Sequence, residues 1–338
     1  MKKKKKFIII VTVILDILAI IFLFFSYGPI AYFRNLLVTS AMSTQSHKYL
    51  ARTLYNETTI EEVLSLNFVV EIEENTNTSE IAFEEIVETE KYESIYEEQI
   101  LKKNEGNDLY KIIPISGSGY VGYVTVIYDA SKIELVTSRY LGTKGEMLQN
   151  MSKNYGAAIA INAGGFNDPG GIGNGGTPTG TVIQNGKVIY QGGATGWTGG
   201  LIGFNSDNVL VLTKDSPSVA IANGIEDAIE FGPFLIVNGQ RAIISGNGGY
   251  GIAPRTAIAQ RKDGIVLFIT IDGRQPGYSL GVDMGTLTDI LERYKAYNAA
   301  NLDGGASSSL NEYGELISKP CALGVTGERW LPNAWMVK

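Results

Sequence analysis

Two positions in the sequence combine a polar side chain with a following pair of glycines. Asp303 follows an apolar run and precedes two glycines directly, and Asn162 follows another apolar run and precedes two more after one residue. A polar residue at a strand end is held by the strand, while glycines let a ligand approach the backbone. We therefore predict one cleft at which both strand ends meet, with Asp303 as a catalytic carboxylate. The residues expected to bind substrate there are Asn162, Gly164, Gly165, Gly304 and Gly305.

A second carboxylate and two arginines are brought together by a predicted hairpin. Arg255 precedes the apolar run 256–260, and after a turn the return run 265–271 ends at Asp272, two residues before Arg274. Antiparallel pairing of residue 260 with 265 would place residue 255 opposite about 270. Asp272 is therefore predicted as the second catalytic carboxylate, with Arg255 and Arg274 as substrate-binding residues. A structural salt bridge would produce the same cluster.

The inventory of side chains narrows the chemistry. The only histidine, His47, lies far from the other candidates in the sequence, so neither a serine or cysteine nucleophile paired with histidine nor a histidine-ligated zinc is expected. Two carboxylates without histidine fit glycoside cleavage, and guanidinium groups fit a phosphate. A substrate in which a sugar is bonded to a phosphate would use both the carboxylates and the guanidinium groups. Phosphate is already a good leaving group, and arginine can neutralise its charge.

No cofactor is predicted, and the sequence leaves open whether a divalent cation takes part. Cys321 is the only cysteine, which excludes an intramolecular disulfide and a thiolate metal cage. Ser307 and Ser308 could bind sugar hydroxyls or phosphate oxygens. A serine nucleophile is less favoured because no base accompanies it. There is no GxxxxGK[ST] sequence, so nucleotide binding is not expected.

The elements that would position these residues belong to an α+β fold, with a mixed, largely antiparallel sheet, few helices and long glycine-rich loops. Asn-Gly pairs at 185–186 and 238–239 predict type I′ hairpins. The one expected helix, Met284–Tyr297, has Asp283 as its N-cap. The predicted strands are Val121–Tyr128, Ile133–Thr137, Ala157–Asn162, Thr181–Gln184, Lys187–Tyr190, Val209–Thr213, Phe234–Val237, Thr256–Gln260, Ile265–Ile271 and Ala299–Leu302.

Residues 164–200 contain five Gly-Gly pairs among interspersed apolar residues. Apolar residues at such frequency are not typical of a low-complexity linker, so we interpret this segment as ordered loops that cross the mouth of the site. A mobile surface flap is the alternative. The composition changes at about residue 117, and we predict one catalytic domain over 117–338.

The N-terminal residues predict a membrane anchor. Phe7–Phe25 contains only Thr12 and Asp16 as polar residues, and about 20 apolar residues span a bilayer core. A cleaved signal peptide is the alternative, although its apolar region is usually shorter. The lysines in the tail 1–6 are expected to stay in the cytoplasm, which places the rest of this single-pass chain on the outer face of the cell membrane.

Residues 26–116 are predicted to form an acidic stalk between the anchor and the catalytic domain. Within Glu57–Ile100 there are fourteen glutamates and one basic residue, Lys91, and such a run is typical of a solvated spacer. A surface for envelope-assembly partners is the alternative. Subtracting the five N-terminal lysines from the net charge of −7 leaves −12 for the remainder, which argues against a nucleic-acid partner.

The order of these motifs resembles the phosphodiester glycosidase family, which includes the animal uncovering enzyme and bacterial proteins of exopolysaccharide biosynthesis. The resemblance covers residues 117–338 and implies hydrolysis of a sugar-1-phosphate diester. It adds Thr179 to the expected substrate-binding residues. The animal enzyme has its anchor at the other chain end, so the sugar specificity cannot be transferred. The segments that carry the resemblance are 162–166, 178–180, 231–233, 254–257, 272–274, 301–308 and 329–334.

The sequence therefore predicts a membrane-anchored, outward-facing glycosidase that hydrolyses a glycan phosphodiester of an envelope or exported polysaccharide. A transferase that passes the same unit to another polymer would use the same residues, and only the acceptor would differ. A non-catalytic glycan-binding scaffold is the third hypothesis. Tyrosine faces that stack on sugars would fit such a scaffold, whereas two aspartates at strand ends argue against it.

Overall fold

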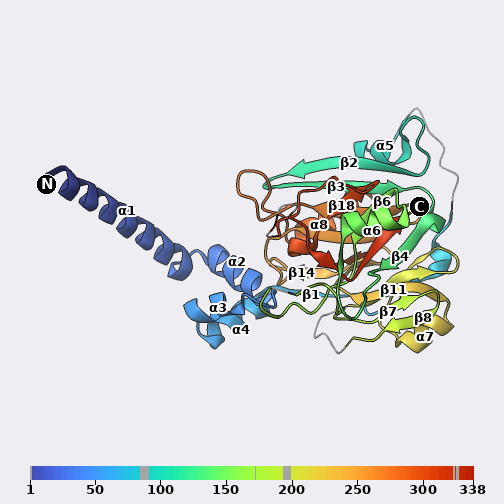
Figure 1. The fold of residues 1–338 in the computed structure, drawn as a ribbon, viewed down its shortest axis with the longest axis horizontal. Helices are drawn as coiled ribbons and strands as arrows, with labels where there is room; N and C mark the ends of the chain where they lie inside the picture. Colours follow the sequence, from blue (N-terminus) through green and yellow to red (C-terminus); the bar gives the residue numbers. More distant parts are fainter. Residues whose placement is uncertain (1, 84–90, 172, 193–198, 323, 325–326) are drawn as a thin grey trace.

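The computed structural model describes residues 2–83, 91–171, 173–192, 199–322, 324 and 327–338 (Figure 1). Within this part of the chain the strands form three larger sheets and two short two-stranded pairs. Every strand pair described is antiparallel. The expected α+β class is confirmed, with a largely antiparallel architecture and α-helices on the outside of the sheets.

The largest sheet has seven strands in the order β13-β12-β17-β15-β16-β3-β2. Side chains alternate between its faces. Ile258 and Phe268 enter a core shared with the two five-stranded sheets, whereas Ala257 and Leu267 enter the opposite core, under helix α8. The strands are β2 (Tyr110–Gly117), β3 (Tyr120–Ile127), β12 (Phe234–Val237), β13 (Gln240–Arg241), β15 (Arg255–Arg261), β16 (Val266–Ile271) and β17 (Ala296–Asn301).

The two five-stranded sheets pack on the shared core. In the first, β19-β18-β6-β21-β4, the fully buried Trp335 lies against Phe204 of the second, β10-β9-β11-β7-β8. The strands of the first are β4 (Ile133–Thr137), β6 (Ile159–Asn162), β18 (Leu310–Glu312), β19 (Glu315–Leu316) and β21 (Asn333–Val337). The strands of the second are β7 (Val182–Gln184), β8 (Lys187–Tyr190), β9 (Gly200–Asn205), β10 (Leu210–Thr213) and β11 (Ile225–Phe231).

Short elements complete the domain. The two-stranded pairs join β1 (Phe68–Val70) with β14 (Ile243–Ser245), and β5 (Glu146–Met147) with β20 (Trp330–Leu331). The α-helices of the domain are α5 (Ile95–Leu101), α6 (Leu148–Tyr155), α7 (Pro217–Ala222) and α8 (Met284–Arg293). The 3₁₀ turns are η1 (Thr78–Glu80), η2 (Ala130–Lys132), η3 (Pro169–Gly171) and η4 (Gly305–Ser307).

All ten predicted strands are present, with ends that differ by up to three residues. The expected N-cap is confirmed, since the Asp283 carboxylate accepts from the Thr286 N–H. The predicted C-terminus of that helix is wrong. Lys295 adopts a left-handed φ of 57°, and β17 begins at the next residue, so Tyr297 belongs to the strand. The hairpin register is also shifted by one residue: Gln260 pairs with Val266, and Arg255 with Ile271.

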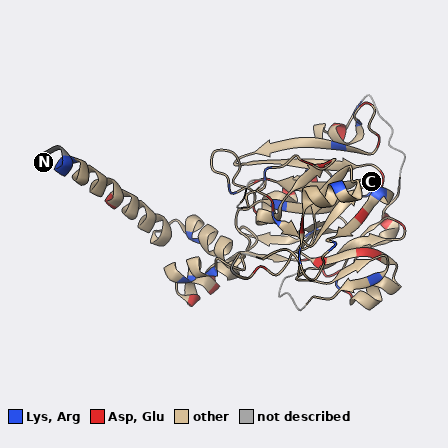
Figure 2. Cartoon of the chain, viewed as in Figure 1, with Lys and Arg blue, Asp and Glu red and all other residues tan. Residues whose placement is uncertain are grey.

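The N-terminal helices extend to one side of the domain (Figure 1). Helix α1 (Lys2–Tyr27) includes one candidate membrane span over Lys4–Tyr27, and Figure 2 shows its long uncharged stretch interrupted by Asp16. Three helices follow, and we call residues 31–66 the juxtamembrane unit: α2 (Ala31–Met42), α3 (Lys48–Leu54) and α4 (Glu57–Leu66). They bury a small core of their own, formed by Val38, Ala41, Ala51, Tyr55, Ile60 and Val63.

The structure differs from the expected stalk over residues 26–116. Strand β2 belongs to the seven-stranded sheet, and Ile100 of α5 is fully buried in the core under that sheet. The carboxylate of Glu71 is buried and accepts from the N–H groups of Gly199 and Phe234. The apolar residues between the glutamates are sufficient to fix the described segments onto the domain. Residues 84–90 of the acidic run lie outside the described residues.

Candidate functional site

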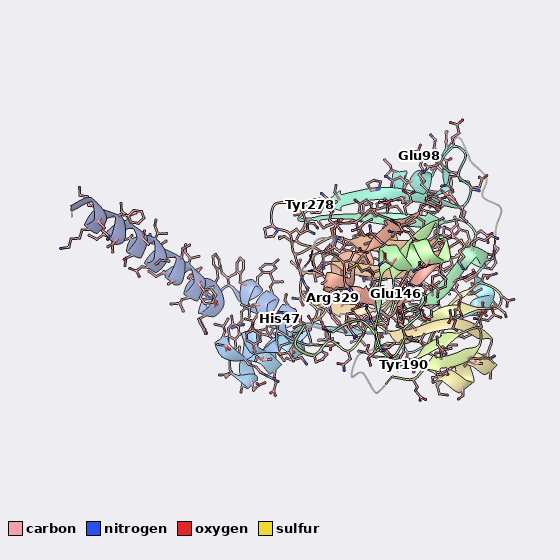
Figure 3. The ribbon with its side chains drawn as sticks, in the orientation of Figure 1. His47, Glu98, Glu146, Tyr190, Tyr278 and Arg329 are labelled. Carbon is pink, nitrogen blue, oxygen red and sulfur yellow. The ribbon has the colours of Figure 1, made fainter. Side chains whose placement is uncertain are left out.

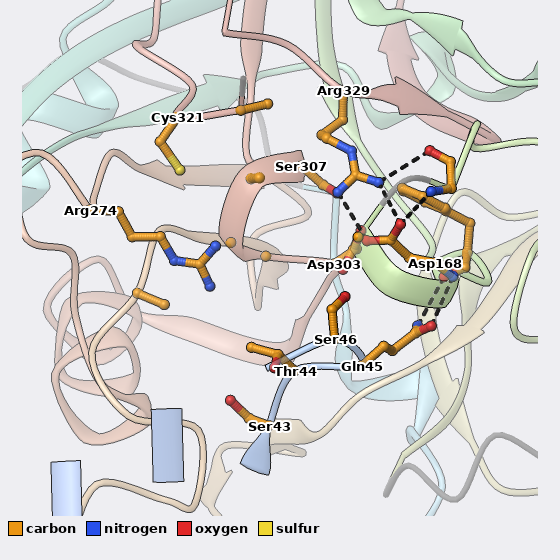
Figure 4. A pocket seen from close by; sticks show the side chains of 18 of the residues that line it. Ser43, Thr44, Gln45, Ser46, Asp168, Arg274, Asp303, Ser307, Cys321 and Arg329 are labelled. Atoms are coloured by element: carbon orange, nitrogen blue, oxygen red, sulfur yellow. Dashed lines mark hydrogen bonds and ion pairs between the residues drawn. The ribbon is translucent and has the colours of Figure 1, made fainter. Parts of the chain in front are cut away.

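A cavity of about 860 Å³ lies where loops from the large sheet and the first five-stranded sheet meet the juxtamembrane unit. Such a volume is within the usual range for sites that bind small molecules. Figure 4 shows Arg274 and Cys321 on one side, Asp168 and Arg329 on the other, and Asp303 with Ser307 between them. The residues that the sequence predicted for one cleft are thus partly brought together.

Asp303 lies two residues after β17 and is fixed through its backbone. Its N–H donates to the Ala163 carbonyl at 3.0 Å, and the Asn162 side-chain amide donates to its carbonyl oxygen at 2.5 Å. The Asn162 side-chain oxygen in turn accepts from the hydroxyl of Thr256 and the N–H of Ser309. Asn162 is fully buried. It therefore positions Asp303 and does not line the cavity, which differs from its predicted contact with substrate.

The surroundings of the Asp303 carboxyl group favour its neutral form. Burial raises the pKa of Asp303 to about 6, although a hydrogen bond from Ser307, the charge of Arg329 and the N–H of Gly304 act in the opposite direction. A carboxyl group with such a pKa is mostly ionised at pH 7 and still basic enough to accept a proton. The structure therefore gives Asp303 the properties of a general base or nucleophile near neutral pH.

Arg255 and Arg274 form a cationic wall of the cavity. Arg255 extends from the first residue of β15, and its guanidinium donates to the carbonyls of Val282, Tyr250 and Gly251 at 3.1, 2.9 and 2.7 Å. Burial, and next the charge of Arg274, lowers the pKa of Arg255 to about 10, so it stays protonated at neutral pH. Within the described part of the chain, neither arginine has a carboxylate at ion-pair distance, although the charge of Asp283 acts on Arg255 from farther away. An anion entering the cavity would therefore meet two guanidinium groups that no ion pair occupies.

The glycines after Asp303 make room for this arginine pair. Gly305 has a φ of 61°, and a β-carbon there would lie about 3.1 Å from the Arg274 guanidinium. Arg274 itself adopts a left-handed φ of 57°, a conformation that costs about 1–2 kcal/mol for a residue with a side chain. Gly304, Gly305 and Ser307 line the cavity as predicted. The glycines were expected to let a ligand approach the backbone. In the structure, the Arg274 guanidinium is the group that approaches the backbone, at Gly305.

Asp168 and Arg329 form the wall opposite Arg274 (Figure 4). Their ion pair measures 3.0 Å, and the Arg329 guanidinium lies over the Phe166 ring at 4.8 Å from its centre. Asp168 also accepts from the Gly173 N–H at 2.6 Å. Asp168 is not among the residues predicted from the sequence, and Arg329 is predicted only as part of the segment 329–334. The position of Asp168 just after the Gly-Gly-Phe-Asn segment was the available signal.

Asp272 is not placed at the cavity. Its side-chain oxygens accept from the Tyr278 hydroxyl and the Lys319 N–H, both at 2.8 Å, and the residue is 1% exposed. Burial raises its pKa, and the two hydrogen bonds act against that change. The predicted pairing of Asp272 with Asp303 across a substrate is therefore not what the structure shows. Asp272 instead joins the loop that carries Arg274 to the segment that carries Cys321.

The remaining predicted residues lie behind the residues that line the cavity. The N–H of Gly164 donates to the Asn333 side-chain oxygen at 2.7 Å, and the N–H of Thr179 donates to the Gly165 carbonyl at 3.0 Å. Ser308 is 2% exposed. None of the predicted residues Gly164, Gly165, Thr179 and Ser308 is among the described residues that line the cavity. The glycine-rich loops do border the cavity through Gly171 and Gly173, while residues 193–198 lie outside the described part.

The connection between α2 and α3 also lines the cavity. The Gln45 side chain donates to the Phe166 carbonyl at 3.0 Å and accepts from the Asp168 N–H at 2.8 Å, so it is bound to the loop that carries Asp168. His47 belongs to the same connection, and Figure 3 shows it where the juxtamembrane unit meets the domain. The expectation that His47 lies away from the site is wrong, because the chain folds back onto residues more than 100 positions later.

Among the described residues, no group of three or more histidine, cysteine, aspartate or glutamate side chains is arranged to hold a metal ion. The cavity instead combines three carboxylates, Asp303, Asp168 and Glu328, with three guanidiniums, Arg255, Arg274 and Arg329. The arrangement can bind an anion on the side of Arg274 and present a carboxylate to a carbon attached to that anion.

Known proteins with similar sequences include a family named for glycosidase activity on phosphodiesters. The model of the phosphodiester glycosidase family matches residues 155–338. An uncharacterised SPbeta prophage-derived protein, YomE of Bacillus subtilis, is 29% identical over 202 residues, which cover 57% of this chain and 30% of YomE. The N-acetylglucosamine-1-phosphodiester alpha-N-acetylglucosaminidase of Bos taurus is 25% identical over 158 residues, which cover 42% of this chain and 29% of the bovine protein. The chain thus spans less than a third of these relatives.

A solved structure is also similar. The catalytic domain of the zebrafish N-acetylglucosamine-1-phosphodiester alpha-N-acetylglucosaminidase, described as auto-inhibited by its pro-peptide, superposes with a TM-score of 0.55 at 20% sequence identity. The superposition covers 70% of this chain and 85% of the zebrafish domain. At that identity the similarity shows a shared fold.

Proposed function

This chain belongs to the phosphodiester glycosidase family, and we propose that it hydrolyses the bond between a sugar and the phosphate at its first carbon. The substrate would be a sugar-1-phosphate diester within an envelope or exported polysaccharide. Asp303 would act at the sugar, and Arg255 with Arg274 would bind the phosphate. The family match supports the reaction class, and the geometry of the cavity supports the assignment of residues.

The observation that carries this proposal is the pair of guanidiniums that lines the same cavity as Asp303. Arg255 and Arg274 both line the cavity, and the described residues contribute no carboxylate as an ion-pair partner to either. Two like charges in a partly buried site are unfavourable unless an anion joins them. A phosphodiester is such an anion, and its departing oxygen gains charge as the bond to the sugar breaks. The positive charges would therefore stabilise the transition state more than the bound substrate.

Asp303 supplies the carboxylate that cleavage at the sugar requires. As the bond between the anomeric carbon and oxygen breaks, its electron pair leaves with the phosphate, and water supplies a hydroxyl group to the carbon. The remaining proton of water passes to a base. An ionised carboxylate with a pKa of about 6 can serve either as that base or as a nucleophile. Asp168, bound to Arg329 in the opposite wall, is a further carboxylate of the cavity, as is Glu328.

We further propose that α1 remains attached as a membrane anchor, with the cavity on the outer face of the membrane. The end of α1 is packed against the following helices: Ser26 is 5% exposed, and its carbonyl accepts from the Tyr55 hydroxyl at 3.0 Å. Cleavage near this point would remove a partner that the folded protein uses. The lysines at the start of the chain favour a cytoplasmic tail.

The proposed reaction can be tested with the purified full chain in detergent and a panel of sugar-1-phosphate methyl diesters. We expect release of free sugar from at least one of them, and loss of that release in the Asp303→Asn variant. A sugar polymer added as acceptor would distinguish hydrolysis from transfer. If the folded protein binds these diesters without forming free sugar or a transfer product, the chain is a glycan-binding scaffold and the proposal is wrong.

A further inference from the structure

The end of helix α1 is held by the juxtamembrane unit through specific contacts. The Tyr27 hydroxyl donates to the Leu54 carbonyl at 2.6 Å, and the Tyr55 hydroxyl donates to the Ser26 carbonyl. The rings of Phe25 and Phe33 lie 4.3 Å apart. These contacts connect α1 to both α2 and α3. The membrane helix is therefore joined to the unit as a packed body, with only residues 28–30 between α1 and α2.

The juxtamembrane unit is in turn fastened to the catalytic domain. The side-chain amide of Asn247 donates to the Thr39 hydroxyl at 2.8 Å, while its backbone N–H donates to Asn67 at 3.1 Å. The Ser245 hydroxyl donates to the Leu66 carbonyl at 2.8 Å, and β1 pairs with β14. Together with the Gln45 contacts at the cavity wall, these bonds bridge the unit and the domain at two separate places. A flexible tether would show neither set.

The outer surface of this region has the character of a membrane interface. Six large apolar or aromatic side chains near the end of α1 and on the unit are 40–60% exposed. Aromatic residues are enriched where a membrane meets water. The unit contains three basic and three acidic residues, and Arg52 forms an ion pair with Glu57 at 3.0 Å. Its apolar and aromatic side chains, and not its charge, therefore give it this character. The exposed side chains are Tyr27, Ile30, Tyr32, Phe33, Tyr49 and Leu50.

We propose that the cavity serves glycan phosphodiesters held in the same bilayer by a lipid, and that the rigid unit fixes the height of the reacting bond above the membrane. Helix α2 has 12 residues and leads directly into the connection that lines the cavity. At 1.5 Å per residue it is about 18 Å long, so the cavity wall lies within about 20 Å of the α2 end next to α1. This inference rests on the proposed function and names its substrate class.

The physical advantage is one of effective concentration. A substrate and an enzyme anchored in one membrane meet at a much higher local concentration than two molecules free in solution, provided that the geometry lets the site reach the bond. A rigid spacer holds the cavity at one distance from the membrane surface. It therefore favours substrates whose scissile bond lies at that distance. A long flexible linker would distribute the site over many heights and lower the effective concentration.

The test compares the full chain with a variant that carries twelve extra Gly and Ser residues after Gly28. The matched control has the same insertion after Gly106, at a position where an added β-carbon would meet no atom within 4 Å. Each protein is reconstituted in vesicles and given one sugar-1-phosphate either as a soluble methyl diester or as a long-chain lipid diester within the membrane. We expect the insertion after Gly28 to lower kcat/KM for the lipid diester at least tenfold, with less than a twofold change for the soluble diester and no effect of the control insertion.

A second readout does not depend on catalysis. Cys321 lines the cavity and is the only cysteine, so a fluorophore attached there reports the distance of the cavity from a dye in the lipid headgroups. We expect strong energy transfer in the parent protein and weaker transfer after the Gly28 insertion. Equal transfer in both proteins, or undiminished cleavage of the lipid diester by the variant, would overturn the inference. Failure of every protein to cleave the soluble diester would instead refute the proposed function, and energy transfer would still decide the position of the cavity.

Discussion

Asp303 is surrounded by groups that hold it in place and by a cavity wall that disfavours its charge. Replacement of Asp303 by asparagine keeps the shape of the side chain but removes the charge and the basicity. We expect the Asp303→Asn variant to lose activity by about 10³-fold or more, because a carboxylate is required at the sugar. The measurement is kcat/KM on a sugar-1-phosphate diester, with circular dichroism as the check on folding. Near-native activity in a folded variant would contradict the assignment.

The same substitution should increase stability. The folded protein holds a proton on Asp303 up to about pH 6, whereas the unfolded chain loses it near pH 4, so this group makes stability decrease as pH rises between these values. Asparagine does not titrate. We expect Asp303→Asn to raise the free energy of unfolding by about 3 kcal/mol above pH 6, with little change below pH 4. Denaturant unfolding at pH 4 and pH 7 measures both values, and equal differences at the two pH values would be evidence against a raised pKa.

The pH dependence of catalysis follows from the same carboxyl group. Because the ionised form is the base or nucleophile, kcat/KM should rise tenfold per pH unit below about pH 6 and level off above it. The measurement is a pH profile with a non-titrating diester. A profile that falls above pH 6 would show that Asp303 acts as an acid, and the roles would have to be reassigned.

Substitutions of Arg274 test whether this residue binds the phosphate of the substrate. Alanine at this position removes the charge, whereas lysine keeps the charge but loses the planar fork that binds two phosphate oxygens. We expect Arg274→Ala to lower kcat/KM by about 10²–10³-fold and Arg274→Lys to lower it less. Inhibition by inorganic phosphate should weaken in the same order. Unchanged inhibition in the alanine variant would place the phosphate elsewhere in the cavity.

The candidate residues could be predicted where they follow strands, because the end of a strand fixes the direction of the next side chain. Asp303 lies in the cavity for this reason, and Arg255 lies there because it begins β15, next to the end of the antiparallel strand β17. Asp272 also follows a strand, yet the actual register differs by one residue, and the loop with Tyr278 closes over its carboxylate. Asp168 and His47 lie in loops, whose positions depend on contacts with distant segments that no local pattern reveals.

Among the elements, the loop that connects β16 to α8 depends on Asp272. We expect Asp272→Ala to lower the free energy of unfolding by about 1–3 kcal/mol, since the Lys319 N–H and the Tyr278 hydroxyl lose their acceptor. The exposed residue Asp207 provides a control, and Asp207→Ala should change stability by less than about 0.5 kcal/mol. Chemical denaturation compares the two variants. Equal stability of both would mean that Asp272 does not hold this loop.

Strand positions were largely predictable because alternating apolar residues report a sheet face, and Asn-Gly turns fix two hairpins. Both Asn185 and Gly186 have positive φ, as do Asn238 and Gly239, which is the conformation that type I′ turns require. The helix after Asp283 was extended too far because Tyr294 and Tyr297 continue its periodicity in the sequence. The periodicity of the sequence cannot show that residues 296–301 are more stable as a strand in the centre of a sheet than as a continuation of the helix.

For the molecule as a whole, the acidic segment shows how far composition can mislead. Fourteen glutamates predict a solvated spacer, but charge on one face of a segment does not prevent burial of its other face. Ile100 and Glu71 are both buried, and each depends on partners more than 100 residues away. Long-range contacts of this kind also bring Gln45 to the cavity.

The orientation across the membrane can be tested with the single cysteine. Cys321 is partly exposed, and burial raises the pKa of its thiol, so labelling should be carried out at alkaline pH. We expect a membrane-impermeant thiol reagent to label Cys321 in intact cells. As a control, a Lys6→Cys variant that also carries Cys321→Ser should react only after lysis. The reverse pattern would place the cavity in the cytoplasm.

The most direct measurement follows the oxygen of water. The purified protein is incubated with a sugar-1-phosphate diester in ¹⁸O-labelled water, and the products are analysed by mass spectrometry. A glycosidase breaks the bond between carbon and oxygen, so we predict ¹⁸O in the released sugar and none in the phosphate monoester. Incorporation of ¹⁸O into the phosphate would show attack at phosphorus and would contradict the central claim that Asp303 acts at the sugar while Arg255 and Arg274 bind the departing phosphate.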